Sequence, residues 1–512
     1  MSVGYLPSRR LPFGAAVAAW YDHESGGRAV WIFLALFVAV WTSFQLIVYS
    51  AVGLDDDLAE VFVWSQHPSA GYQKHPPLTA LVAWTWFKVF PVREWSFYLL
   101  AMVNAAVALF AVYLIARRYI KGDKRLLVLL LLLLTPFYQF HGQRFNNNAV
   151  LLSTWPIATY CFLRAFRSRG LAWSAVAGVM AALAMLGKYY SIYLVAGFAV
   201  AALWHPRRWD YLRSASPWVS SLCGLAVLSP HLYWLATMGP EPFRYALAAH
   251  GGTSVWGATG AALEYAAGAL GYVLVPFAAY LAAVRPNRRQ LAAALWPDDP
   301  DRRMLVVLLA APLLLPMLTA PIIGVKLTSL WTMSAWFLLP IVLLGAPEIT
   351  LTRVAAVRVA LGLMALTAVI LAAAPAVAWK NYLQESGHGR AYYRIASEEL
   401  TRSWRMIMRR PLRIVSGDPA LAQAASVYSP DHPDSAPDFA TSSRPWITRD
   451  RWAREGWAAL CFAHEHGCLD AAKRFSAGRA GVVRIRKTLA VSFFGLSGTL
   501  AKVVFIMAPP RQ

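Results

Sequence analysis

Charged residues are scarce in this sequence, and acidic residues are the scarcest. Only 14% of the 512 residues are charged, and 26 Asp and Glu stand against 48 Lys and Arg. A soluble domain carries about 25% charged residues. Apolar residues make up 58% of the chain, fall in long runs and give a mean hydropathy of +0.45. This composition excludes an ordinary soluble domain and predicts an α-helical polytopic membrane protein.

Other absences narrow the class further. The strict apolar–polar alternation of a membrane β-barrel is missing, and no short internal repeat is evident. Residues 1–21 lack an uninterrupted apolar core and a cleavage site, so we expect no removable signal peptide. We expect the first apolar run to act as the insertion signal instead.

The net charge of +22 comes from clusters of Lys and Arg. The clusters recur after every second apolar run, as the cytoplasmic loops of membrane proteins do. They lie at 9–10, 117–125, 164–169, 207–208, 285–289, 302–303 and 353–358. We therefore interpret the positive charge as a determinant of membrane topology and expect no nucleic-acid partner.

These clusters divide the apolar runs into about eleven spans, because each crossing needs roughly 20 apolar residues. We expect spans near 29–51, 95–116, 125–140, 149–166, 171–187, 190–204, 216–237, 258–283, 304–323, 328–346 and 354–378. An odd number of spans places the N terminus inside and the C-terminal part outside. The chain then divides into a membrane domain, residues 1–380, and an outer domain, residues 381–512.

The outer domain is expected to be a small α+β domain. Charges, Pro and Ser return after about residue 381, and turn signals separate short runs of β-forming residues. The runs at 413–415, 482–485 and 502–506 predict strands, and residues 398–408 predict a helix. A segment of this size is large enough for a core of its own.

The sequence contains four cysteines, of which Cys161 and Cys223 fall in expected spans. Cys461 and Cys468 lie in the outer domain, with His464 and His466 between them. Two cysteines in an oxidising compartment more often form a disulfide. Free thiols, or a metal site of two Cys and two His, are the alternatives.

An acidic stretch follows the first span. Residues 54–60 read LDDDLAE and hold four of the 26 acidic residues. Carboxylates near hydrocarbon are costly and usually functional. The loop, about 52–94, continues with GYQKHPPL at 71–78 and an apolar, Trp-rich piece at 78–90. This piece is short for a span and predicts an interfacial or re-entrant helix.

Polar residues of the expected outer face have the chemistry for transfer from a phosphate-linked donor to a hydroxyl. A carboxylate can accept the proton of an attacking hydroxyl, and cations can hold a phosphate. The candidates are Asp55, Asp56, Asp57, Glu60, Lys74, His75, Arg144, Asn146, Lys188, Tyr189, His231 and Lys326. The alternative is that these are ordinary solvated loop residues, with the Lys188 side chain reaching toward lipid headgroups.

Several motifs resemble those of the bacterial polyprenyl-phosphate-sugar glycosyltransferases of the GT-C superfamily, families 39 and 83. The pattern L-x-x-D-x-x-E at 54–60, with WSQ at 64–66 and GYQKHPPL at 71–78, is similar to their first periplasmic loop. RFNNN at 144–148, GKY at 187–189, SPH at 229–231 and KLTSLW at 326–331 follow in the family's order. This group includes protein O-mannosyltransferases, the lipid A aminoarabinose transferase and lipopolysaccharide galacturonosyltransferases.

The resemblance implies an inverting transferase that moves a sugar from a polyprenyl-phosphate carrier to an acceptor hydroxyl. By position, Asp57 matches the family's catalytic aspartate, which would be the general base. Asp55 and Asp56 crowd it, so the base could instead be one of these two neighbours. Glu60 would orient the acceptor or fix the loop.

For the donor phosphate, the resemblance favours Lys188 first, followed by Lys74, His75 and Arg144. Tyr189 would hydrogen bond to the phosphate or the sugar. Some members of the superfamily use a divalent cation, and residues 55–60 could supply its ligands, whereas the close relatives rely on basic residues. No cofactor is firmly predicted.

The remaining expectations concern the partners and the location. The acceptor is an envelope glycan such as lipopolysaccharide or lipid A, another glycan, a lipid or a protein, and the site faces the periplasm from a bacterial inner membrane. A transporter or flippase for a lipid-linked sugar is the alternative function. A structural or sensory membrane protein is a third interpretation, but it gives the acidic loop no role.

Overall fold

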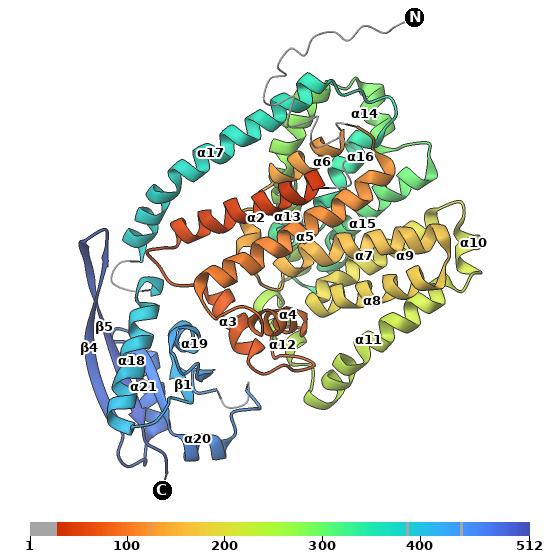
Figure 1. Cartoon of the computed structure of the whole chain (residues 1–512). Coiled ribbons are helices and arrows are strands. Elements are labelled where there is room, and N and C mark those ends of the chain that lie inside the picture. The colour runs from red at the N-terminus through yellow and green to blue at the C-terminus, as the bar shows by residue number, and fades with distance from the viewer. Residues whose placement is uncertain (1–27, 123, 386–388, 441–443, 512) are drawn as a thin grey trace, which may run out of the picture.

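The computed structural model describes residues 28–511 except 123, 386–388 and 441–443. The expectations for residues 1–21 and the basic pair at 9–10 lie outside the described residues. The chain forms a large helical part and a C-terminal part built on a β-sheet (Figure 1).

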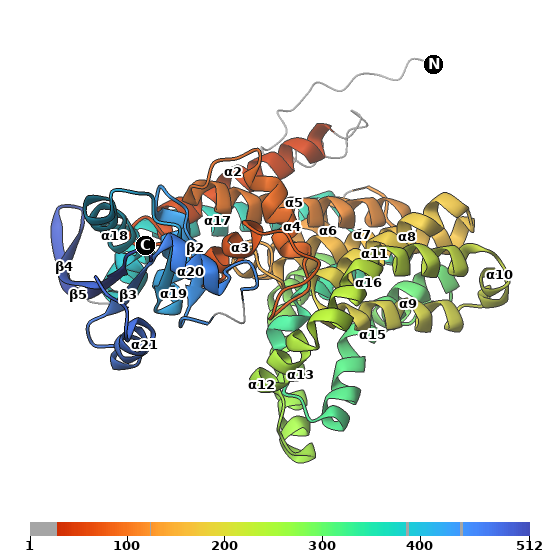
Figure 2. The same cartoon turned by 90° about the horizontal axis from the view of Figure 1, so that it is seen from below.

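The helical part begins at α2 and ends with α17. Its elements are α2 (Arg28–Val48), α3 (Asp56–Ser65), α4 (Leu78–Phe87), α5 (Glu94–Tyr119), α6 (Lys124–Leu133), η1 (His141–Gln143), α7 (Ala149–Ser168), α8 (Leu171–Gly187), η2 (Tyr189–Ser191), α9 (Ile192–Trp204), α10 (Arg208–Leu212), α11 (Ser216–Met238), α12 (Glu241–His250), α13 (Val255–Val284), α14 (Arg288–Leu295), α15 (Pro300–Ile323), η3 (Ser329–Ser334), η4 (Trp336–Leu338), α16 (Leu339–Gly345) and α17 (Arg353–Gln384). In Figure 2, α12 and α13 project with α15 as an arm from the rest of this part.

Within the described residues, seven helices are long and apolar enough to cross a membrane, namely α2, α5, α7, α11, α13, α15 and α17. The chain is a helical multi-pass membrane protein. Every expected span contains helix, but the stretches near 125–140, 171–187, 190–204 and 328–346 hold shorter helices. In the first of these, α6 ends at Leu133. Pro136 follows, and the residue before a proline is disfavoured in the α conformation.

The stretch near 328–346 is also interrupted. It begins as the 3-10 turns η3 and η4, and the α-helical part, α16, starts only at Leu339. Pro340 lies in the first turn of α16, where a proline costs no helical hydrogen bond. The expected helix at 78–90 corresponds to α4, and the acidic stretch itself forms the helix α3.

The C-terminal part contains η5 (Gly389–Tyr392), α18 (Tyr393–Met408), β1 (Ile414–Gly417), α19 (Pro419–Tyr428), β2 (Asp434–Pro437), α20 (Arg449–Glu455), β3 (Trp457–Phe462), α21 (His466–Ser476), β4 (Val483–Phe493) and β5 (Leu496–Ala508). The strand order is β2-β1-β3-β5-β4. The strands β1, β2 and β3 are parallel, and β5 runs antiparallel to both β3 and β4. The expected strands are β1, β4 and β5, and the sheet is mixed, with helical crossovers in its parallel half.

Alternating residues of the strands build a core on each face of the sheet, because successive side chains of a strand point to opposite faces. Val503 and Phe505 of β5 pack on the side of α18 and α19. Val504 and Ile506 pack on the side of α20 and α21. The result is a three-layer arrangement of helices, sheet and helices.

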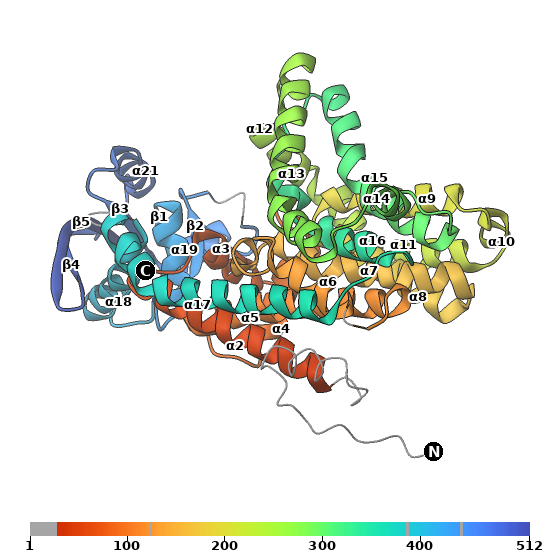
Figure 3. The same ribbon diagram turned by 90° about the horizontal axis from the view of Figure 1, so that it is seen from above.

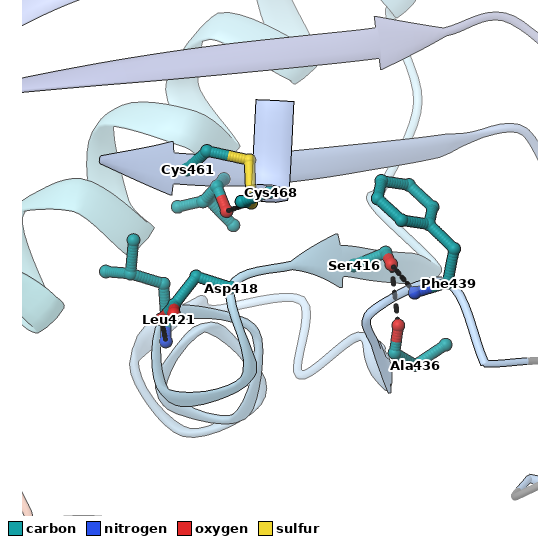
Figure 4. Close-up of a disulfide and its surroundings, with 8 residues drawn as sticks. Ser416, Asp418, Leu421, Ala436, Phe439, Cys461 and Cys468 are labelled. Atoms are coloured by element: carbon teal, nitrogen blue, oxygen red, sulfur yellow. Dashed lines mark hydrogen bonds between the residues drawn. A yellow bond between two sulfur atoms is a disulfide. The ribbon is translucent and has the colours of Figure 1, made fainter. Parts of the chain in front are cut away.

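Two local links stabilise the carboxyl-end edge of the parallel strands (Figure 4). Cys461 of β3 forms a disulfide with Cys468 of α21. The Ser416 hydroxyl of β1 donates to the Ala436 carbonyl of β2 at 2.6 Å and accepts from the Phe439 N–H at 3.1 Å. The C-terminal part lies at the end of α17 (Figure 3), and its helix α19 packs against the acidic helix α3.

Candidate functional site

Asp55 caps the acidic helix, and both of its carboxylate oxygens have partners. Its carboxylate accepts the Asp57 N–H at 3.2 Å as the N-cap of α3, the position where an anion complements the helix dipole. The other oxygen, Oδ2, lies 3.1 Å from Arg144 Nε and 3.1 Å from Arg390 Nη1. Two guanidiniums therefore neutralise Asp55.

Asp56 has a different environment. The Tyr393 hydroxyl donates a hydrogen bond to its carboxylate. Partial burial, and next the charge of Asp55, raise the pKa of Asp56 to about 6. Near neutral pH this carboxylate is ionised at an energetic cost.

Asp57 is exposed. Its Oδ2 accepts a hydrogen bond from Asn146 Nδ2 at 2.8 Å. The Asn146 side-chain oxygen in turn accepts the N–H groups of Asn148 at 2.9 Å and Ala149 at 3.0 Å. A neutral amide fixed at the start of α7 thus orients Asp57 without neutralising it.

Glu60 pairs with Lys74 from the following loop. Lys74 Nζ lies 2.6 Å from Glu60 Oε1 and 5.7 Å from the centre of the Tyr245 ring of α12. Gln423 of α19 approaches the same Glu60 oxygen at 3.4 Å. Glu60 therefore joins the loop, and with it Lys74, to the acidic helix.

Lys188 lies in the turn between α8 and α9, outside both helices. Its ammonium donates to Asn148 Oδ1 at 2.6 Å and lies 4.4 Å from the centre of the Trp331 ring. Burial without a carboxylate partner lowers the pKa of Lys188 to about 7. An anion placed here would favour the charged form of this amine.

His75 marks the point where the cations converge. Burial, and then the charges of Lys188, Lys74 and His250, lower the pKa of His75 to about 3. The imidazole is therefore neutral near pH 7. The charges of Lys74 in the first loop and of Lys188 in the α8–α9 turn both act on this ring, so the two cations lie near each other.

Beside this cluster, Tyr189 and His231 link the α8–α9 turn and α11 to the first loop. The Tyr189 hydroxyl lies 2.8 Å from His231 Nε2, and His231 Nδ1 lies 2.7 Å from the Ala70 carbonyl oxygen. Since a carbonyl only accepts, His231 carries its proton on Nδ1. At Gly71, a Cβ would come within 2.4 Å of the Trp234 ring, so only glycine permits this close approach of the loop to α11.

Lys326 lies at the margin of the site. Its backbone N–H donates to the His250 carbonyl at 2.8 Å, and its side chain is exposed. The His250 ring lies 5.0 Å from the ring of Trp331, which also contacts Lys188. The structure thus pairs Asp57 with Asn146, Asp55 with Arg144 and Glu60 with Lys74, and it places His75 within reach of the charges of Lys74 and Lys188. Tyr189 and His231 join the same loop through the Ala70 carbonyl, and Lys326 lies beside His250 through its backbone.

Comparison with known proteins finds a family match for part of the chain. Residues 74–234 match the model of a family described as dolichyl-phosphate-mannose-protein mannosyltransferase. This segment, about a third of the chain, is similar to the GT-C glycosyltransferases that use polyprenyl-phosphate sugars. The matched segment runs from Lys74 to α11 and includes Arg144, Asn146 and Lys188, but it begins after the acidic helix.

Solved structures extend the likeness to the whole fold of the chain. ArnT from Cupriavidus metallidurans bound to undecaprenyl phosphate is similar with a TM-score of 0.54 and 12% identity, over 93% of this chain and 98% of that chain. The apo state of the same ArnT gives a TM-score of 0.54 and 14% identity over the same shares. At such identities the likeness shows the fold alone. No curated protein sequence matched the chain.

The candidate site includes residues that the sequence did not identify. Arg390 and Tyr393 contact Asp55 and Asp56 from more than 330 positions away in the sequence. They lie outside every quoted motif, so no local signal pointed to them. Asn148 and Trp331 stand inside the quoted motifs, and their roles beside Lys188 emerged only from the fold.

The acidic residues do not fit a divalent-cation site. Asp55 already faces two guanidiniums and Glu60 faces an ammonium, so their oxygens are not free to share one ion. Among the described residues, no group of three or more His, Cys, Asp or Glu is arranged to hold a metal. We therefore derive no catalytic step through a metal.

Proposed function

We propose that this glycosyltransferase moves a sugar from a polyprenyl-phosphate carrier to a hydroxyl of an envelope acceptor, with inversion and with Asp57 as the general base. The observation that supports the assignment is the contrast among the carboxylates. Asp55 is neutralised by Arg144 and Arg390, and Glu60 by Lys74. Asp56 and Asp57 are both exposed and lack a cationic partner among the described residues, but Asp56 accepts a hydrogen bond from the Tyr393 hydroxyl of the C-terminal part, whereas Asp57 contacts the amide of Asn146 beside the Lys188 site. Only an unneutralised carboxylate open to the acceptor can take up its proton efficiently.

The proposed reaction is a single displacement. The acceptor hydroxyl transfers its proton to Asp57 while its oxygen bonds to the anomeric carbon of the sugar. The bond between that carbon and the carrier phosphate breaks, and the phosphate leaves with the bonding electrons and one more negative charge. One displacement at the anomeric carbon inverts its configuration.

The cations are proposed to stabilise the leaving phosphate. Lys188 contacts Asn148 and Trp331. No carboxylate in the described part of the chain forms an ion pair with it, so its charge is available to a donor. Lys74, Arg144 and neutral His75 are proposed to line the adjacent side, and His231 holds the loop that carries Lys74 and His75 through the Ala70 carbonyl. Fixed charges in a partly dehydrated site stabilise developing charge better than water does.

The membrane placement follows the same proposal. We infer about eleven membrane segments with the N terminus in the cytoplasm, in a bacterial inner membrane. The acidic helix and the C-terminal domain, from about residue 381, would face the periplasm. The acceptor would be lipopolysaccharide, lipid A, another glycan, a lipid or a protein carrying a free hydroxyl there.

The test is transfer of radiolabel from polyprenyl-phosphate sugars in a membrane extract by the purified protein. Asp57→Asn should lower the transfer rate by about 10²–10⁴-fold, because a general base of this kind contributes that much. Donor binding should persist, since the phosphate-binding cations are unchanged.

Asp56→Asn is the matched control, because it removes an adjacent carboxylate of the same helix. This variant should keep most of its activity. If Asp57→Asn retains full transfer while Asp56→Asn loses it, Asp56 is the base and the assignment fails. The labelled product also identifies the acceptor.

A further inference from the structure

A groove opens at the end of the helical part that lies away from the acidic helix. It has a volume of about 920 Å³ and lies between the last turns of α13 and the first turns of α17. In Figure 1, α17 begins near α14 and ends near the sheet, so the groove and the acidic helix occupy opposite ends of α17. The groove is therefore separate from the site described above.

The walls of the groove are apolar and made of small side chains. On α13 they are Val275, Ala278, Ala279, Ala282 and Ala283, and on α17 they are Val354, Ala355, Val359, Gly362 and Leu363. Small residues usually let membrane helices pack closely. Here the two helix faces stay apart and leave a space that an apolar chain can fill.

The depth of the groove matches one leaflet of a bilayer. From Arg285 to Val275 the wall spans ten residues of α13, or about 15 Å at roughly 1.5 Å per residue. The hydrocarbon core of a bilayer is about 30 Å thick. The groove thus reaches from one membrane surface to about the middle of the core.

The mouth of the groove is positively charged. Arg285 ends α13, and Arg358 lies five residues inside α17, both with exposed side chains. Neither guanidinium pairs with a carboxylate in the part of the chain that the structure describes. A charged residue inside a membrane helix usually faces a cavity or a partner, and here it faces the groove beside the hydroxyl-bearing Thr350 and Thr352.

We propose that this groove is a binding site for a phospholipid with an anionic headgroup, taken from the leaflet opposite the acidic helix. The acyl chain lies between α13 and α17, and the headgroup phosphate bridges Arg285 and Arg358. The charge complementarity and the one-leaflet depth together favour such a lipid over a zwitterionic lipid or a peptide. Basic pockets between membrane helices bind anionic lipids in this way.

Native mass spectrometry of the full-length protein, released from nanodiscs with equal amounts of phosphatidylglycerol and phosphatidylethanolamine of identical chains, tests the site. Wild type should retain one phosphatidylglycerol with a preference of about tenfold or more, since two guanidiniums contribute. Arg285→Gln combined with Arg358→Gln should reduce the preference to about one. The matched control, Arg288→Gln with Arg289→Gln, changes two nearby arginines outside the groove and should keep it.

A second variant tests the space of the groove without changing the charge at its mouth. Ala282→Trp fills the space and should remove the retained lipid while leaving both arginines in place. Equal retention of the two lipids by wild type, or unchanged preference in the arginine double variant or in Ala282→Trp, would overturn the proposal. Retention of a polyprenyl phosphate in place of the phospholipid would also overturn it.

Discussion

Lys188 is the residue whose chemistry depends most on its surroundings. Its ammonium has an amide and an aromatic ring as neighbours, and burial lowers its pKa to about 7. Below that pH the amine is charged before any donor arrives. Above it, donor binding must be accompanied by uptake of a proton.

This predicts a pH dependence of donor binding. As the pH rises from 7 to 9, kcat/KM for the donor should fall by up to about tenfold per pH unit, because the fraction of charged Lys188 falls with the same slope. The donor is a phosphodiester and does not titrate in this range. The measurement is the initial rate at limiting donor concentration across this pH range.

Lys188→Arg is the control for that profile. Arginine stays charged throughout, so the variant should lose the decline, even if its activity is lower at every pH. Identical slopes in wild type and Lys188→Arg would show that another group titrates.

At the scale of elements, the segment leading into α18 holds the acidic helix. The Gly53 N–H donates to the Arg390 carbonyl at 2.9 Å, and the Arg390 side chain reaches Asp55 at 3.1 Å. Tyr428 of α19 accepts the Leu54 N–H at 2.7 Å and donates to Glu94 at 2.6 Å. The C-terminal part therefore fixes both the backbone and the N-cap of α3, and with them the direction of Asp57.

Arg390 is accordingly predicted to be a positioning residue. Arg390→Gln should lower kcat by about 10–100-fold, since small displacements of a catalytic group are costly, while KM for the donor changes by less than about threefold. Steady-state kinetics with varied donor measures both quantities. Arg390→Lys should restore part of kcat.

The control for this prediction is Arg402→Gln on α18. Arg402 forms its ion pair with Glu399 on the same helix, away from α3, and its loss should leave kcat within about twofold, as expected for an exposed pair. A rise in donor KM with unchanged kcat in Arg390→Gln would instead make Arg390 part of the donor site.

At the scale of the whole molecule, α17 runs between two polar regions, one near each end of the helix. The acidic helix and the sheet lie near its C-terminal end, whereas the lipid groove and the basic residues of α14 lie near its start. A helix of 32 residues is about 48 Å long, longer than a bilayer core is thick. The proposed topology accordingly places the two ends on opposite sides of the membrane.

The proposed orientation predicts which end meets the periplasm. In a Cys223→Ser background, a membrane-impermeant maleimide should label Gln73→Cys in intact cells with a permeabilised outer membrane. Arg289→Cys should react only after lysis, because basic loops remain in the cytoplasm. Labelling of Arg289→Cys but not of Gln73→Cys in intact cells would reverse the orientation.

Much of the helical part was predictable because a membrane span is a local property of the sequence. A run such as 354–378 meets lipid along its length, so its composition alone must satisfy the bilayer. The strands β4 and β5 were predictable for a similar local reason. By contrast, β2 and β3 were missed: β2 has only four residues, and β3 is buried on both faces and lacks the alternation of a half-exposed strand.

The sequence by itself determined that this is a multi-pass helical membrane protein with an acidic first loop, and its motifs pointed to a polyprenyl-phosphate transferase. The tertiary structure decided how the three aspartates differ. They are adjacent in the chain, yet Asp55 meets two arginines, Asp56 meets Tyr393 and Asp57 meets Asn146. Partners brought together from distant segments set the charge and orientation of a carboxylate, and no local pattern records those contacts.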